Sequence, residues 1–324
     1  MRAIQVQRHG GPEVLELMEI PLPGRPGADQ VTVRVIAAGV NFMDVAQQRG
    51  TYPRGVPFIP GWEGSGIIET VGEGVSAFKA GDRVAFGYQP GTYAEAIHVD
   101  ASKLVALPDD FTFEQGAAFL TQGLTAQYMI HEFRRLAAGE FVLVHAAAGG
   151  VGGLLVQWAR HLGAVVIGTV SSEEKARVAY ELGAQHVIVY TKEHFAAETR
   201  RITGGHGADL ILDGVGRSTS QDNLAAVAVR GHIVIFGASS GPADPIPPYP
   251  LIQNSISLCG GSLLHLNRFQ ERVREVVSGI REGWLKLSIG GVLPLEQAGK
   301  AHQLLEGRLS QGKFVLLVAK PPNS

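Results

Sequence analysis

The chain has 324 residues, of which 45% are hydrophobic and 18% charged, and its formal net charge is −2 at pH 7. This composition indicates a globular protein of about two domains, and the slight negative charge gives no support to a nucleic-acid partner. No apolar run is long enough to span a bilayer, and the N-terminus resembles no signal peptide. The single cysteine, Cys259, excludes an internal disulfide, so we expect a cytoplasmic protein.

The first third of the chain is rich in short alternating apolar runs, in Gly and in Pro. This pattern predicts an antiparallel β-rich domain in the form of a partly open barrel. The expected strands are residues 3–7, 14–19, 30–38, 66–71, 82–86 and 92–99. A helical stretch after Gln115 marks the expected start of a second domain.

A Gly-rich turn is the most informative segment of that second domain. The sequence Ala-Ala-Gly-Gly-Val-Gly at 147–152 follows the apolar run 141–144 and precedes a helical apolar pattern over 154–162. A turn between a strand and a helix start binds a dinucleotide pyrophosphate through free N–H groups and the positive helix end. We therefore expect Gly149, Gly150 and Val151 to contact the pyrophosphate.

The end of the next strand, 165–170, predicts which dinucleotide binds. NAD-binding units place Asp or Glu there, about 20 residues beyond the Gly-rich turn, to bind the ribose 2′-hydroxyl. This chain has Ser171 and Ser172 instead, followed by Glu173, Glu174 and Lys175. Ser172 is a predicted N-cap with both glutamates in the first helical turn, and Lys175 is in reach of a 2′-phosphate. The pattern favours NADPH over NADH.

Further strands alternate with helical segments at 186–190, 209–213, 232–236 and, less clearly, 257–259. Such alternation predicts a parallel doubly wound sheet with its ligand at the carboxyl ends of the strands. The residues at these ends, which we expect to line the cofactor cleft, are Ser171, Tyr190, Val215, Phe236 and Gly237. The tail has a predicted helix at 295–306 and a strand at 313–318, which we expect to return to the first domain.

Characteristic motifs are spread over most of the chain, in the segments 41–44 (NFMD), 60–66 (PGWEGSG), 71–75 and 80–84, 123–126 (GLTA), 145–152 (HAAAGGVG) and 236–241 (FGASSG). Together these motifs resemble the zinc-independent quinone oxidoreductase (zeta-crystallin-like) family of medium-chain dehydrogenases/reductases, and the resemblance runs nearly end to end. It implies an α/β fold with a GroES-like β-rich catalytic domain over 1–119 and 265–324. The resemblance also implies a Rossmann NADPH-binding domain over 120–264.

Zinc-dependent relatives place Cys where this chain has Asn41 and His where it has Trp62. A catalytic zinc needs Cys, His or carboxylate ligands, and neither of these residues replaces them. We therefore expect no metal. A metal-free enzyme needs an acceptor that takes hydride readily, so the resemblance implies NADPH-dependent reduction of quinones or other conjugated carbonyls. Two alternatives stay open: an enoyl-thioester or enone reductase, and an NADPH-binding protein with little catalysis.

The resemblance also assigns site residues. Asn41 and Tyr52 are the candidate catalytic residues, and Asp44 either orients Asn41 or caps the following helix. Ala46 replaces a tyrosine of many relatives, which implies a wider or less polar acceptor pocket. The positions implied for cofactor binding are Asn41, Thr125, Gly149, Gly150, Val151, Ser171, Lys175, Tyr190, Val215, Phe236, Gly237, Ser239 and Arg308. The segment 257–266 matches an edge strand through which relatives pair, so we expect a homodimer.

Overall fold

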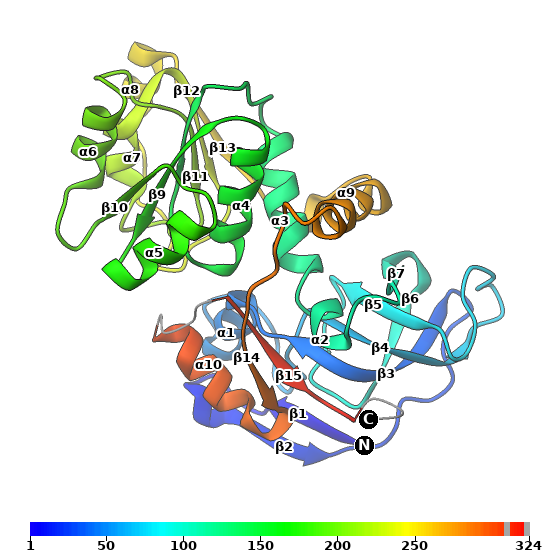
Figure 1. The fold of residues 1–324 in the computed structure, drawn as a ribbon. Coiled ribbons are helices and arrows are strands. Elements are labelled where there is room, and N and C mark those ends of the chain that lie inside the picture. Colours follow the sequence, from blue (N-terminus) through cyan, green and yellow to red (C-terminus); the bar gives the residue numbers. More distant parts are fainter. Residues whose placement is uncertain (308–311, 321–324) are drawn as a thin grey trace. The chain divides into compact units, whose positions relative to one another are not determined.

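A computed structural model describes residues 1–307 and 312–320 (Figure 1). The chain divides into two compact units, of which unit 1 comprises residues 1–121 and 287–324 and unit 2 comprises residues 122–286. Within the described residues, none of the helices has both the length and the apolar character needed to cross a membrane.

Unit 1 is built on a mixed sheet in the order β14-β15-β3-β4-β5-β7, with β6 also paired to β3, while β1 and β2 form a separate hairpin. Its strands are β1 (Arg2–Val6), β2 (Leu15–Glu19), β3 (Gln30–Gly39), β4 (Glu63–Val71), β5 (Arg83–Gly87), β6 (Ala96–Asp100), β7 (Leu104–Ala106), β14 (Ile289–Pro294) and β15 (Lys313–Leu317). Every pair in this unit is antiparallel except β14 with β15. The unit is therefore β-rich and mostly antiparallel, as the alternating pattern predicts.

Unit 1 also contains short helices. They are η1 (Pro12–Val14), α1 (Phe42–Arg49), η2 (Ala101–Lys103), α2 (Phe113–Gly116), η4 (Leu295–Gln297) and α10 (Ala298–Glu306). The last strand, β15, lies between β14 and β3, and its Leu316 is opposite Ala38. Leu316 therefore packs in the same apolar core as Val33, Val35 and Phe86, although it lies far from them in the sequence.

Unit 2 is a parallel sheet in the order β10-β9-β8-β11-β12-β13 (Figure 1). The strands are β8 (Phe141–Val144), β9 (Val165–Val170), β10 (His186–Val189), β11 (Ala208–Asp213), β12 (Val227–Ile235) and β13 (Ser257–Gly260). The strand order reverses between β8 and β11, and in such sheets a ligand binds outside the carboxyl ends at that reversal. The fold thereby places the Gly-rich turn, which follows β8, at the expected ligand position.

The helices of unit 2 are α3 (Leu120–His131, which begins in unit 1), α4 (Gly150–His161), α5 (Glu173–Glu181), α6 (Phe195–Ile202), α7 (Ser220–Ala226), α8 (Pro248–Asn254), η3 (Leu263–His265) and α9 (Phe269–Arg281). Helices α6 and α7 bury Phe195 and Ala226 against one sheet face with Leu143, Ile167 and Ile211. Both faces of the sheet are covered by helices, which explains why its strands read as continuous apolar runs (Figure 1).

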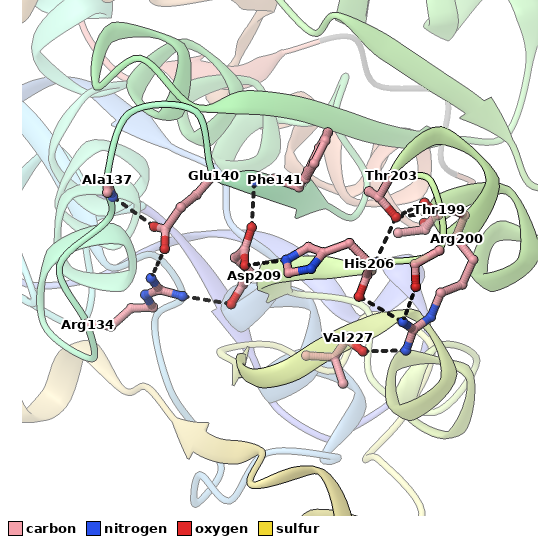
Figure 2. A network of polar contacts seen from close by, with 12 residues as sticks. Arg134, Ala137, Glu140, Phe141, Thr199, Arg200, Thr203, His206, Asp209 and Val227 are labelled. Atoms are coloured by element: carbon pink, nitrogen blue, oxygen red, sulfur yellow. Dashed lines mark hydrogen bonds and ion pairs between the residues drawn. The ribbon is translucent and has the colours of Figure 1, made fainter.

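A polar network fixes the amino ends of β8 and β11 (Figure 2). The Asp209 carboxylate accepts a hydrogen bond from the Phe141 N–H at 2.9 Å and lies 2.8 Å from His206 Nε2. Arg134 donates to the Asp209 carbonyl at 2.9 Å and forms an ion pair with Glu140. This network holds the two central strands together at the edge opposite the Gly-rich turn.

The boundary near residue 265 differs from the expectation. Residues 265–286, expected in the first domain, belong to unit 2, and the chain enters unit 1 only at 287. Helix α9 packs on α3 because the buried Arg272 guanidinium donates to Gln127 Oε1 at 2.6 Å and lies 4.9 Å from the Tyr128 ring centre. The predicted helix at 295–306 also differs, since its first turn is the 3₁₀ turn η4 and α10 begins at Ala298.

Candidate functional site

The Gly-rich turn presents unpaired backbone donors at the start of α4. Gly149 is the N-cap residue and supplies no side-chain cap to the helix. The first N–H groups of a helix, here those of Gly150, Val151 and Gly152, have no acceptor within the helix. An anion bound at this position receives these hydrogen bonds together with the positive end of the helix dipole.

Close packing against the backbone requires glycine at position 152 of the turn. A Cβ atom on Gly152 would lie 2.2 Å from the Ala146 carbonyl oxygen, whereas one on Gly150 would lie 2.1 Å from the nitrogen at the end of the flexible Gln122 side chain. Ala146 itself adopts a left-handed conformation with φ of 51°. The glycines leave no side chain between the backbone and an approaching phosphate, and the turn fits a dinucleotide.

The ends of β9 and β10 bring the predicted adenosine-phosphate residues together. Ser172 is the N-cap of α5, and its hydroxyl accepts a hydrogen bond from the Lys175 N–H at 3.3 Å. The Tyr190 N–H donates to Val170 O at 3.1 Å, and the Thr191 hydroxyl donates to the Ser171 carbonyl at 3.2 Å. Ser171 and Tyr190 therefore lie at adjacent strand ends, and a serine stands where an NAD-binding unit has its acidic residue.

The loops after β11 and β12 are joined in the same way. The Ser240 N–H donates to Val215 O at 2.9 Å, and the Ser239 N–H donates to Gly214 O at 3.3 Å. A Cβ atom on Gly237 would lie 2.6 Å from Gly214 O. These contacts gather the predicted positions in the two loops, namely Val215, Phe236, Gly237 and Ser239. Of the remaining positions, Thr125 is buried on α3 and Arg308 lies outside the described residues.

In unit 1, the Asn41 amide is held by a buried ion pair. Lys313 Nζ donates to Asn41 Oδ1 at 2.6 Å and forms an ion pair with Glu63, while Asn41 Nδ2 donates to Glu63 Oε1 at 2.9 Å. The Lys313 and Glu63 side chains are 1% and 0% exposed. The other Glu63 oxygen accepts from the Thr121 N–H at 2.9 Å. Among the residues described, no acceptor takes the second N–H of the Asn41 amide, which remains able to donate.

Asp44 caps α1, as one of the two sequence interpretations has it. Its Oδ2 accepts from the Asn41 N–H at 2.7 Å and from the Tyr93 hydroxyl at 3.2 Å. The Tyr93 hydroxyl also lies 3.1 Å from His302 Nε2. Burial raises the pKa of Asp44 to about 7 and lowers that of His302 to about 3. His302 is therefore a buried packing residue of α10.

At the two positions that carry zinc ligands in zinc-dependent relatives, the side chains of this protein form hydrogen bonds within the protein. The Asn41 amide oxygen accepts from Lys313, and Trp62 Nε1 donates to Gln47 Oε1 at 2.9 Å. In the described ranges, no group of three or more His, Cys, Asp or Glu residues is placed to hold a metal ion. The donor set around Asn41 and Trp62 does not fit a catalytic zinc.

Tyr52 lies at the end of α1, where its N–H donates to Ala46 O at 3.1 Å. Its side chain is half-buried. Sequence reasoning missed the roles of Glu63 and Lys313. The available signal was a lysine at the start of the apolar strand 313–318, since a charge in such a strand is buried only when it is paired.

Comparison with known proteins agrees with this architecture. Residues 27–109 match the family model described as alcohol dehydrogenase GroES-like domain, and residues 150–278 match the model described as zinc-binding dehydrogenase. A Pseudomonas aeruginosa quinone oxidoreductase is 40% identical over 98% of this chain and 99% of its own length. A 2-haloacrylate reductase of a Burkholderia species is 37% identical over 97% of this chain and 98% of its own length.

Solved structures agree as well. A mycobacterial protein complexed with NADPH is 42% identical, with a TM-score of 0.94 over 98% of this chain and 100% of its own. The Escherichia coli quinone oxidoreductase complexed with NADPH is 36% identical, with the same TM-score and the same coverage of both chains. The chain therefore belongs to the quinone oxidoreductase family of the medium-chain dehydrogenases/reductases, and it is an oxidoreductase.

Proposed function

We propose that this protein uses NADPH to reduce quinones or other conjugated carbonyl acceptors without zinc. The observation that carries the proposal is the buried Asn41–Glu63–Lys313 cluster. Asn41 stands at the position of a zinc ligand in zinc-dependent relatives, yet its amide oxygen accepts from the Lys313 ammonium group, which is also paired with Glu63. An acceptor that is already conjugated needs no metal to take a hydride.

The cofactor is proposed to be NADPH. The turn at Gly149 to Gly152 offers backbone donors to the pyrophosphate, and Ser171 leaves room for a 2′-phosphate that a carboxylate would repel. Lys175, in the first turn of α5, supplies a positive charge near this phosphate. Two relatives of known structure are complexed with NADPH, which supports the choice.

The residues of unit 1 contribute orientation and proton transfer. When bound, the cofactor would supply a hydride, which would leave negative charge on the oxygen of the acceptor. The free N–H of Asn41 is proposed to donate to that oxygen, because Lys313 and Glu63 fix the amide in one orientation. The Tyr52 hydroxyl is proposed as the proton donor that completes the reduction.

Activated alkenes form the second candidate class of acceptor. The similarity to a 2-haloacrylate reductase favours this class, since that name describes reduction of a conjugated carboxylic acid.

The protein is also proposed to be a cytoplasmic homodimer. Strand β13 ends the described sheet of unit 2 and pairs on one side only, with β12. Apolar side chains are exposed nearby, with Ile252 71%, Tyr249 65% and Leu264 55% accessible. Pairing of two such edges would cover them. Light scattering tests this proposal, and a mass near the 34.4 kDa of one chain would contradict it.

The deciding experiment is NADPH oxidation with a matched panel of an ortho-quinone, a para-quinone, a simple enone, a trans-2-enoyl thioester and 2-chloroacrylate, with NADH as the control cofactor. Turnover of quinones with NADPH supports the proposal. Turnover of the alkenes alone would assign the enzyme to the second class. NADPH binding without turnover of any acceptor in the panel would contradict the proposal.

A further inference from the structure

A buried polar network joins three strands of unit 2 near their carboxyl ends. His145 follows β8, Thr169 lies in β9, Asp213 ends β11, and Asn223 lies on α7. None of the four residues is more than 2% exposed. Buried polar groups cost free energy unless each finds a partner, so their placement here needs a reason.

The hydrogen bonds run in one direction through the network. Asn223 Nδ2 donates to Asp213 Oδ2 at 2.7 Å, so the Asn223 amide oxygen faces His145 Nε2 at 2.8 Å. His145 Nε2 therefore carries the proton, and Nδ1 accepts from the Thr169 hydroxyl at 2.9 Å. Burial lowers the pKa of His145, which keeps the ring in this neutral form.

The Asp213 carboxylate continues the network into the loop after β11. Its Oδ1 accepts from the N–H groups of Val215 at 2.7 Å and Gly216 at 3.1 Å, and its Oδ2 also accepts from the Thr219 hydroxyl at 2.7 Å. The main chain adds further links, since the His145 N–H donates to Leu212 O at 3.1 Å. The carboxylate thus fixes the conformation of the loop that holds Val215.

We propose that Asn223, His145 and Asp213 are positioning residues for the cofactor. Asn223 links the loops after β8 and β9, which hold Gly149 and Ser171, to the loop after β11. A ligand of a doubly wound sheet binds across the ends of these strands, so its affinity depends on their mutual placement. The inference rests on the proposed function, because it takes NADPH as the ligand.

The same strands provide a matched control at their other end. Asp209 stands at the amino end of β11 and joins it to β8 through the Phe141 N–H, remote from the ligand edge (Figure 2). Asp209→Asn and Asp213→Asn thus make the same chemical change four residues apart on one strand. Both are expected to lower the melting temperature, whereas only Asp213→Asn should weaken cofactor binding.

The test measures the dissociation constant of NADPH by fluorescence titration, at a temperature where each variant is folded. We expect Asp213→Asn and Asn223→Leu to raise it at least about tenfold, and Asp209→Asn to leave it within about twofold of the wild type. Thr169→Val, which replaces the hydroxyl by a methyl group of similar size, should weaken NADPH binding, and Thr169→Ser should restore it. This pair of variants tests the inference where the other variants do not fold.

Wild-type affinity in folded Asp213→Asn, Asn223→Leu or Thr169→Val protein would overturn the inference while leaving the proposed function intact. Equal losses in Asp209→Asn and Asp213→Asn would also overturn it, since both would then reflect general stability. A wild-type protein that does not bind NADPH would overturn the proposed function and this inference together.

Discussion

Replacing Lys313 by methionine should destabilise unit 1 strongly. The ammonium group of Lys313 is 1% exposed and its partner Glu63 is 0% exposed, so the variant leaves a carboxylate buried without its cation. Removing one partner of a buried ion pair costs about 3–5 kcal/mol. For a domain of about 150–250 residues each kcal/mol lowers the melting temperature by about 2–4 °C, so the expected loss is about 6–20 °C.

Differential scanning calorimetry measures this change, and Lys192→Met is the control. Lys192 pairs with Glu173 on the surface, where both side chains are 62% exposed. Exposed pairs contribute about 0–1 kcal/mol, so this control should shift the melting temperature by no more than about 4 °C. The double variant Lys313→Met with Glu63→Gln should be more stable than Lys313→Met alone, because the unpaired charge is gone.

Two results would refute this reasoning. A loss below about 1 kcal/mol in Lys313→Met would mean that the Glu63 carboxylate is stabilised without its cation. A double variant whose loss equals the sum of the two single losses would mean that Lys313 and Glu63 do not interact.

Three further predictions concern the turn, the buried acid and the metal. Gly152→Ala should weaken NADPH binding and cost about 1–3 kcal/mol, because its Cβ would lie 2.2 Å from a backbone oxygen. At Gly153 the nearest atom is the end of the Leu182 side chain and the nearest backbone oxygen is 3.7 Å away, so Gly153→Ala should be tolerated. The raised pKa of Asp44 makes its contribution to stability fall as pH rises from about 4 to 7, while the lowered pKa of His302 makes its contribution fall as pH drops from about 6.5 to 3. Asp44→Asn should therefore gain stability relative to the wild type between pH 4 and 7 in urea unfolding, and parallel curves would speak against it. Dialysis against a zinc chelator should leave the rate of NADPH oxidation unchanged, and a loss that zinc restores would refute the metal-free proposal.

The parallel sheet was predictable because its signals are local. Each strand of unit 2 is a short apolar run, and the turn at 147–152 lies between one of these runs and a helix. The same locality predicted the N-cap at Ser172, and it gave the cap of α1 by Asp44 as one of two interpretations. These features depend on residues within a few positions of one another, where a sequence pattern is informative.

The interactions across long sequence separations were not predictable in this way. Lys313 and Glu63 are 250 positions apart, and the sequence around one residue does not indicate that the other is its partner. The return of the chain to unit 1 was placed too early for a related reason. The apolar pattern of α9 indicates that one face of the helix is buried, but it does not indicate that this face packs on α3.

The place of β15 in the sheet has a consequence for the order in which the protein matures. Residues 122–286 contain their own sheet and core, so they can fold as soon as they have been synthesised. Unit 1 cannot complete its sheet so early, because residues 37–39 of β3 lack a partner strand on one edge until β15 pairs with them. A nascent chain that stalls before residue 313 would expose this edge and a Glu63 carboxylate with no cation, and would be a natural target for chaperones.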